Sequence, residues 1–179
     1  MTSPFALQPD DFTIFDSETG SFVFAAWKNV LIVVWAGQID GPAVERFTKA
    51  VEKMSASRPG LRSNVHVVTQ GTALPTPEAR AGLVGSMTRH SGELASVSVV
   101  FCGTGFWASA LRAAVTGMRF LAPRSFDFQL FGTIDEVIQW LPPEHEKITG
   151  VYLDPGSLRS ALKAAQGRIN SRGESARPI

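Results

Sequence analysis

Two apolar runs joined by two residues dominate the sequence: Phe22–Trp27 (FVFAAW), then Lys28-Asn29, then Val30–Ala36 (VLIVVWA). Each run has the length of a strand, and asparagine at position 29 suits the left-handed backbone that a two-residue hairpin turn requires. The second run is apolar at every position. We therefore expect it to be covered on both faces and to lie in the middle of a sheet.

A third strand is expected on the N-terminal side of this hairpin. Phe12–Phe15 is short and apolar, and Ser17–Gly20 has the composition of a turn that ends in a glycine tolerant of positive φ. Residues 1–10 contain two prolines and are predicted to form a flexible arm. The N-terminal part of the chain is therefore predicted to be an antiparallel meander.

The period of the apolar pattern changes after the hairpin, from two residues to between three and four. An amphipathic helix is expected from Gly41-Pro42 to Ser57. Short strands and helices then alternate: strands at 65–68, 97–102 and 126–131, and helices starting near 77, 106 and 134. Right-handed crossovers make such strands parallel. The sequence predicts an α/β fold in which the antiparallel meander continues into a mixed, partly parallel sheet with crossover helices.

The C-terminal part is predicted to be appended to this unit. Pro142-Pro143 are expected to close the preceding helix, and 144–149 is mostly polar and reads as a hinge. An amphipathic helix then follows from about Pro155 to Asn170. Its apolar stripe favours packing on its own sheet slightly over homodimerisation. The predicted division is an arm at 1–10, the α/β domain at 11–142, a hinge and helix at 143–170, and a disordered tail at 171–179.

Charge and composition exclude several classes of protein. The sequence contains 17 Lys and Arg and 16 Asp and Glu, so the basic excess typical of nucleic-acid binding is missing. The apolar runs are too short to cross a bilayer, and the N-terminus lacks the basic region of a secretory signal. The single cysteine, Cys102, excludes an internal disulfide and fits a reducing compartment. We expect a cytoplasmic protein.

Several local strings resemble the STAS family (sulfate transporter and anti-sigma factor antagonist, SpoIIAA-like), in particular an uncharacterised bacterial branch of it. The resemblance covers roughly residues 12–141. It rests on the order of the elements and on these strings: FDSETG (15–20), KNVLI (28–32), PEARA (77–81), GFWAS (105–109) and LFGTIDEVIQWL (130–141).

This resemblance implies a non-enzymatic module that docks on a partner protein and regulates it. Some STAS domains are switched by phosphorylation of a Ser or Thr between the strand after the first helix and the next helix. The matching stretch here is Val67–Thr72, in which Thr69 and Thr72 are the available hydroxyls. The Asp-Ser pair typical of regulated members is absent from it.

An alternative function rests on the segment GTGFWA at 103–108, which formally matches the dinucleotide-binding fingerprint G-x-G-x-x-A. It follows an expected strand and opens an expected helix. Gly103, Thr104, Gly105 and Trp107 are therefore candidate ligand-binding residues for a nucleotide or a lipid. The competing interpretation is a tight turn that needs glycine, with Phe106 and Trp107 packed under the sheet or at a contact surface, since these two side chains would crowd a pyrophosphate.

The remaining reactive side chains form no recognisable catalytic or metal-binding motif. His66, His90 and His145 lack the spacing of metal ligands, and His66 is expected to be a satisfied core residue more than a pocket residue. Cys102 has no base at a motif spacing. The sequence predicts no cofactor, no metal and no enzymatic activity.

Overall fold

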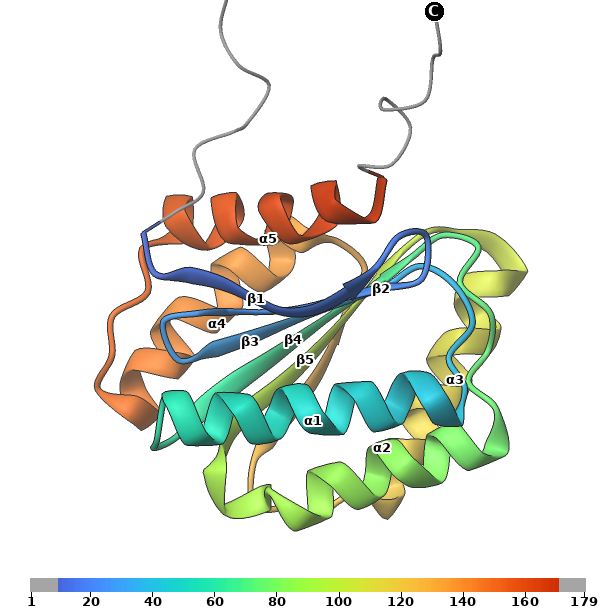
Figure 1. Ribbon diagram of the computed structural model, residues 1–179, viewed down its shortest axis with the longest axis horizontal. Helices are drawn as coiled ribbons and strands as arrows, with labels where there is room; N and C mark the ends of the chain where they lie inside the picture. Colours follow the sequence, from blue (N-terminus) through green and yellow to red (C-terminus); the bar gives the residue numbers. More distant parts are fainter. Residues whose placement is uncertain (1–9, 171–179) are drawn as a thin grey trace, which may run out of the picture.

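The structure, a computed structural model, describes residues 10–170. This part of the chain folds into one six-stranded sheet with helices on both faces (Figure 1). The strands are β1 (Phe12–Glu18), β2 (Phe22–Trp27), β3 (Val30–Trp35), β4 (Arg62–Thr69), β5 (Leu94–Cys102) and β6 (Asp127–Phe131). The helices are α1 (Gly41–Ser57), α2 (Pro77–Arg89), the short 3-10 helix η1 (Ser91–Glu93), α3 (Gly105–Leu121), α4 (Ile134–Thr149) and α5 (Pro155–Asn170).

The sheet confirms the predicted α/β class. Its strands lie in sequence order from β1 to β6, with β1, β2 and β3 antiparallel and β3 to β6 parallel. The residues of β2 and β3 are all buried, as the uninterrupted apolar runs predicted. The mixed sheet is therefore an antiparallel meander extended by parallel strands.

The strand order determines which helices cover which face. Each parallel crossover advances in the same direction, and right-handed crossovers then place α1, α2 and α3 on one face (Figure 1). The opposite face is covered by α4 and α5, which follow the last strand. Each face has its own apolar core, the first under α1–α3 and the second under α4 and α5.

The hairpin turn between β2 and β3 differs from the prediction in one detail. Lys28, with φ of 49°, is the residue of this turn in the left-handed region, and Asn29 is not. The Asn29 side chain instead donates to the Leu61 carbonyl oxygen at 2.9 Å and contacts His145. Asparagine is used here for its amide group and not for its backbone tolerance.

The predicted helix end at Leu141 and the polar hinge after it are wrong. α4 continues through Pro142 and Pro143 to Thr149. A capping box at Thr133 starts this helix, in agreement with the predicted start near 134. The two prolines remove two backbone hydrogen bonds, but Leu141, Pro142 and His145 are buried on one face, and this packing maintains the helix.

α5 is part of the core and is not an appendage. Leu158, Ala161, Leu162 and Ala165 are completely buried in the core that also contains the second face of β2 and β3. The intramolecular packing that the sequence slightly favoured is the observed one. The apolar stripe that suggested a homodimer through this helix is thus covered within the chain.

β4 begins three residues earlier than expected, with a buried polar segment. Arg62 is 1% exposed and its Nη1 lies 2.5 Å from Glu93 Oε2. Hydrogen bonds from Ser55 and Arg62 lower the pKa of Glu93 to about 2. Partners of this kind let polar residues occupy a strand interior, which an apolar pattern does not reveal.

Candidate functional site

The carboxyl edge of the parallel strands is the usual ligand site in open α/β sheets, at the point where the strand order reverses. No reversal occurs among β3 to β6, because they follow one another in sequence order. This edge therefore lacks the crevice that a reversal creates, and the segment at 103–107 lies there.

The Gly103–Trp107 turn is filled by its own side chains. A Cβ built on Gly103 would lie 2.5 Å from Cζ3 of Trp107, so the indole packs directly on this glycine. The indole N–H donates to the Thr72 carbonyl oxygen at 2.7 Å. Gly105 has φ of +77°, and the side chain of Thr104 makes no cap hydrogen bond. The structure thus brings Trp107 to the loop after β4.

The two threonines proposed for phosphorylation lie at the end of β4 and in the loop that follows it. Thr69 Oγ1 donates to the Trp35 carbonyl oxygen at 3.0 Å. Thr72 Oγ1 lies 3.0 Å from that oxygen and 2.7 Å from the Thr69 carbonyl oxygen. Thr72 is completely buried, whereas Thr69 is partly exposed. The Thr72 hydroxyl is therefore shielded from a kinase in the folded protein, and the Thr69 hydroxyl is shielded in part.

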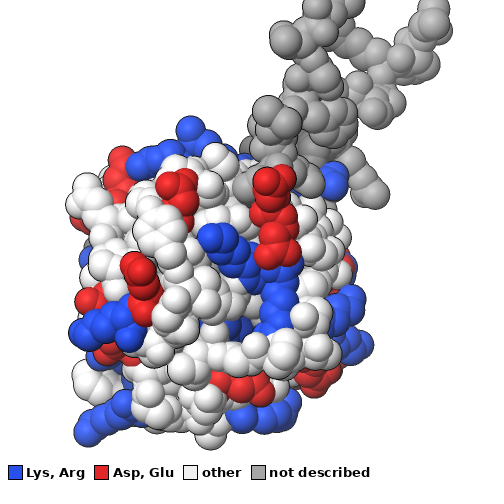
Figure 2. Space-filling view, turned by 90° about the vertical axis from the view of Figure 1, so that its left-hand side faces the viewer, with Lys and Arg blue, Asp and Glu red and all other residues white. Residues whose placement is uncertain are grey.

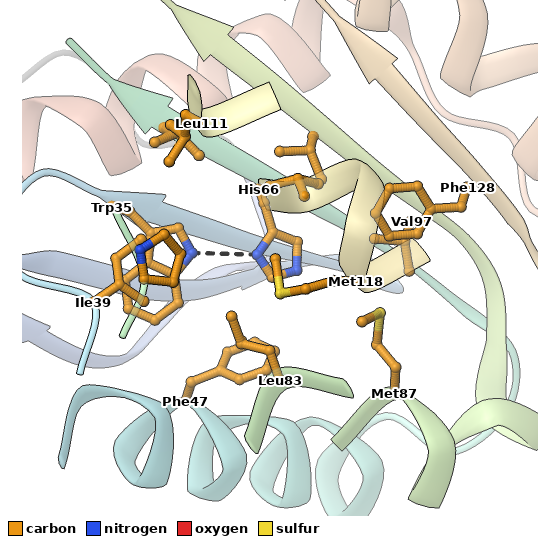
Figure 3. A pocket seen from close by; sticks show the side chains of 14 residues that line it. Trp35, Ile39, Phe47, His66, Leu83, Met87, Val97, Leu111, Met118 and Phe128 are labelled. Carbon is orange, nitrogen blue, oxygen red and sulfur yellow. Dashed lines mark hydrogen bonds between the residues drawn. The ribbon is translucent and has the colours of Figure 1, made fainter. Parts of the chain in front are cut away.

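A cavity of about 50 Å³ lies between the sheet and helices α1–α3 (Figure 3). Fourteen side chains from β3 to β6 and from the three helices, with the loops next to them, line this cavity. They are almost all apolar: Trp35, Ile39, Phe47, His66, Val68, Pro75, Leu83, Met87, Val97, Val99, Leu111, Val115, Met118 and Phe128.

The cavity exists because α2 contributes little to the core. In this helix only Ala79, Leu83 and Ser86 are buried. Gly82 lets α2 lie close to α1, since a Cβ there would lie 2.9 Å from Val44 Cγ1. Figure 1 shows α2 beyond α1 on this side of the sheet. Leu83 and Met87 are the α2 side chains that reach the cavity.

His66 carries the one imidazole among the lining residues, and sequence analysis had favoured a core position for it. Its Nδ1 accepts a hydrogen bond from the Trp35 indole N–H at 3.3 Å. Its ring also packs against Phe47, with centroids 5.5 Å apart. Burial lowers the pKa of His66 to about 4, so the ring is neutral at pH 7. The residue combines a core position with a polar group on the cavity wall.

A second buried histidine is part of a chain of hydrogen bonds on the other face. Ser96 Oγ donates to Ser63 Oγ at 2.8 Å, and Ser63 Oγ lies 2.7 Å from His145 Nδ1. The other ring nitrogen of His145 lies 2.9 Å from Asn29 Oδ1. The order serine, histidine, amide resembles a hydrolase triad. However, Ser63 and His145 are 0% exposed, so a substrate has no access to this hydroxyl.

The remaining candidates show no arrangement for chemistry. Burial raises the pKa of the Cys102 thiol, which reduces the thiolate fraction at neutral pH. Within the described residues, no three His, Cys, Asp or Glu side chains are grouped to hold a metal ion. His90 lies at the end of α2, 3.6 Å from a Glu93 oxygen.

The charged side chains on the visible surface are of mixed sign. On the face in Figure 2, blue and red side chains are interspersed, and neither sign forms a large field. Ion pairs between partly or fully exposed side chains also occur, such as Arg159 with Asp135, 2.5 Å apart. Among residues 10–170, no helix combines the length and apolar character needed to cross a bilayer.

No protein-family model matches the chain, and no curated protein matches it. The resemblance to the STAS family therefore stays a prediction. The site has to be interpreted from its own geometry.

Proposed function

We propose that the protein is a non-catalytic binding protein of the bacterial cytoplasm, whose site is the cavity under α1–α3 and whose ligand is a small apolar molecule. The observation that carries this proposal is the lining itself. Apolar side chains surround a cavity in which a single imidazole supplies the polar contact. Binding sites for small molecules commonly have this composition, with few polar groups that orient the ligand.

The size of the cavity indicates how a ligand would be accommodated. An engineered apolar cavity of about 150 Å³ binds benzene, and the cavity here is about 50 Å³. Met87 and Met118 form part of its wall. Methionine side chains have three rotatable bonds and rearrange at low cost. Their movement would enlarge the cavity without unfolding a helix.

The route of entry is expected to lie between α2 and α3. A surface groove there is lined by small residues, among them Ala81, Gly85, Ala114 and Gly117. Met118 lines both this groove and the cavity. We therefore expect the Met118 side chain to lie between the groove and the cavity, so that its rotation would connect them.

Binding of short-chain ketones and alkenes, measured by NMR titration and by the shift of Tm, tests the proposal. Saturable binding to the wild-type protein is expected. Val115→Leu extends a lining side chain into the cavity and should weaken binding at least tenfold. Val151→Leu is the matched control, since Val151 packs on the opposite core. Equal binding by both variants, or no binding by the wild type, would contradict a site in this cavity.

A second proposed function is the regulatory protein interaction that the STAS resemblance implies. The observation that favours it is the exposure of Phe120 and Leu121 at the end of α3, 78% and 73%. Leu121 also lines the groove between α2 and α3. Exposed apolar side chains beside an apolar groove are typical of a docking surface for a protein partner.

Photo-crosslinking in cells tests this interaction. A crosslinking amino acid at position 121 should capture one discrete protein, and the same amino acid at the exposed Ser160 of α5 should not. Identical products from both positions, or none from position 121, would argue against docking at this groove.

A further inference from the structure

We infer that the ligand of the cavity has an uncharged hydrogen-bond acceptor, such as a ketone, ester or amide carbonyl, and that this oxygen accepts the Nε2 proton of His66. The inference rests on the proposed binding function. It specifies the chemical class of the ligand.

The position of the proton on His66 follows from its neighbour. The indole N–H of Trp35 can only donate, so Nδ1 of His66, 3.3 Å away, has to be the unprotonated nitrogen. A neutral imidazole carries one proton, and this proton is therefore on Nε2. Trp35 thus determines the tautomer, and Figure 3 shows the dashed bond between the two rings.

The Nε2–H group has no protein acceptor within the described residues. The hydrogen bond to Trp35 occupies the other ring nitrogen. Apart from His66, the lining side chains offer aliphatic groups, aromatic rings and two thioethers. In Figure 3 the second nitrogen of His66 is directed to the space among the labelled side chains. A ligand that displaces water from this N–H group costs the group a hydrogen bond unless the ligand supplies an acceptor, so a ligand with an acceptor here would be favoured.

Water is a poor substitute for such a ligand. A buried water molecule ordinarily makes two to four hydrogen bonds. In this cavity His66 is the one side chain with a strong polar group that faces the space, because the Trp35 N–H is already bonded. An oxygen on an apolar molecule needs only this one donor and fills the rest of the cavity with carbon.

The lining also selects against charged ligands. No Asp, Glu, Lys or Arg is among the fourteen lining residues. Burial keeps His66 neutral, with its pKa near 4. A carboxylate, phosphate or ammonium group would lose its hydration without meeting an opposite charge, which is costly in an apolar site. The acceptor is accordingly an uncharged oxygen.

Three probes of the same shape test the inference: methyl butyl ketone, the alkene in which a CH2 group replaces the carbonyl oxygen, and pentanoate, in which an oxygen replaces the methyl group. Their Kd values are measured by NMR titration of the full chain. The ketone should bind about three- to tenfold more tightly, relative to the alkene, in the wild type than in His66→Phe, as one neutral hydrogen bond predicts. Pentanoate should bind most weakly.

Two further variants distinguish the effect of the His66 N–H donor from the effect of how its ring packs. His66→Gln retains an N–H donor and should recover part of the ketone preference. Trp35→Phe retains an aromatic ring but no longer determines the tautomer. It should reduce the ketone preference, and the nitrogen NMR signals of His66 should then report both tautomers. Equal ketone preference in the wild type, His66→Phe and Trp35→Phe would overturn the role of the imidazole.

A measurement on the wild type alone keeps the test independent of variant folding. The carbonyl stretch of the bound ketone should move to lower frequency than in hexane, as for an oxygen that accepts a hydrogen bond. An unshifted stretch, or tightest binding by pentanoate with uptake of a proton, would overturn the inference while leaving a ligand site in place. If none of the three probes binds, the proposed function itself fails.

Discussion

His66 and His145 lie on opposite faces of the sheet, His66 half-buried and His145 completely buried, and desolvation lowers the pKa of each to about 4, with a smaller contribution from Lys28 for His145. His66 accepts a hydrogen bond from Trp35 through Nδ1, and both ring nitrogens of His145 have hydrogen-bond partners. His145 connects α4 to β4 and the β2–β3 turn. At the residue scale, an uncharged imidazole makes polar contacts within each of the two cores.

These two pKa values predict a loss of stability in weak acid. In the unfolded chain a histidine titrates near its model value of 6.5, whereas in the folded protein it stays unprotonated until about pH 4. Between these limits only the unfolded state binds the protons, so the free energy of unfolding falls as pH decreases. We expect a slope of up to about 1.4 kcal/mol per pH unit for each histidine.

Urea denaturation between pH 7.5 and pH 5 measures this slope. Carboxylates with the ordinary pKa values of 3.8 and 4.5 are still mostly ionised at pH 5, so the histidines dominate the slope over this interval. His145→Gln removes one of the two groups and should reduce the slope by about half, whatever its effect on absolute stability. A stability that is independent of pH over this interval would show that neither ring is held neutral by the fold.

Gly103 supports a second prediction at the residue scale. Its Cβ position lies 2.5 Å from Trp107 Cζ3, so Gly103→Ala should displace the indole and lower the free energy of unfolding by about 1–3 kcal/mol. Gly132→Ala is the control, since the nearest atom there is 3.6 Å away. Denaturation followed by tryptophan fluorescence checks both. Equal stability of the two variants would contradict the packing of Trp107 on Gly103.

At the scale of the element, α2 is the least integrated of the crossover helices. Thr76 caps it, and the Ala79 N–H donates to its Oγ1 at 3.1 Å. Yet two glycines interrupt the helix and few of its side chains are buried. α2 thus has a good N-terminal cap but few buried side chains. Space is left between this helix and the sheet, and the cavity lies there.

The two glycines of α2 should respond differently to alanine. No atom lies within 4 Å of a Cβ at Gly85, and its φ is ordinary, so Gly85→Ala should stabilise the protein by about 0.5–1 kcal/mol through helix propensity. Gly82→Ala should gain less or destabilise, because Val44 Cγ1 is 2.9 Å from the new methyl group. Thermal unfolding of both variants gives the comparison. A larger gain at position 82 would be inconsistent with the observed contact of α1 with α2.

At the scale of the whole molecule, the fold is closed by its C-terminal helices. The crossover helices cover one face of the sheet, and α4 and α5 are the elements that cover the other. Without α5, completely buried residues of β2 and β3, such as Val23 and Ile32, would be open to water. The domain limits at 142 that the sequence suggested would therefore cut through a core.

A chain truncated after Leu141 tests this closure. It should fail to fold cooperatively, since it loses the last part of α4 and all of α5, and should bind a hydrophobic dye such as ANS. Truncation after Asn170 is the control and should leave Tm within a few degrees of the full chain. A cooperative thermal transition in the shorter chain would restore the appended-helix interpretation.

Local pattern alone identified the hairpin of β2 and β3, the crossover helices and the α/β class, because the spacing of apolar residues reflects which side of an element is covered. It also placed helix starts near 77 and 134, where Thr76 and Thr133 provide the caps, since capping needs only neighbouring residues. The continuation of α4 through Pro142 was decided by the tertiary structure, as burial of one face compensated for a poor local sequence. The tertiary structure also decided the cavity. Trp35, His66 and Leu83 come from three separate elements, and only the packing of α2, a helix with few buried side chains, over the sheet brings them together around one space.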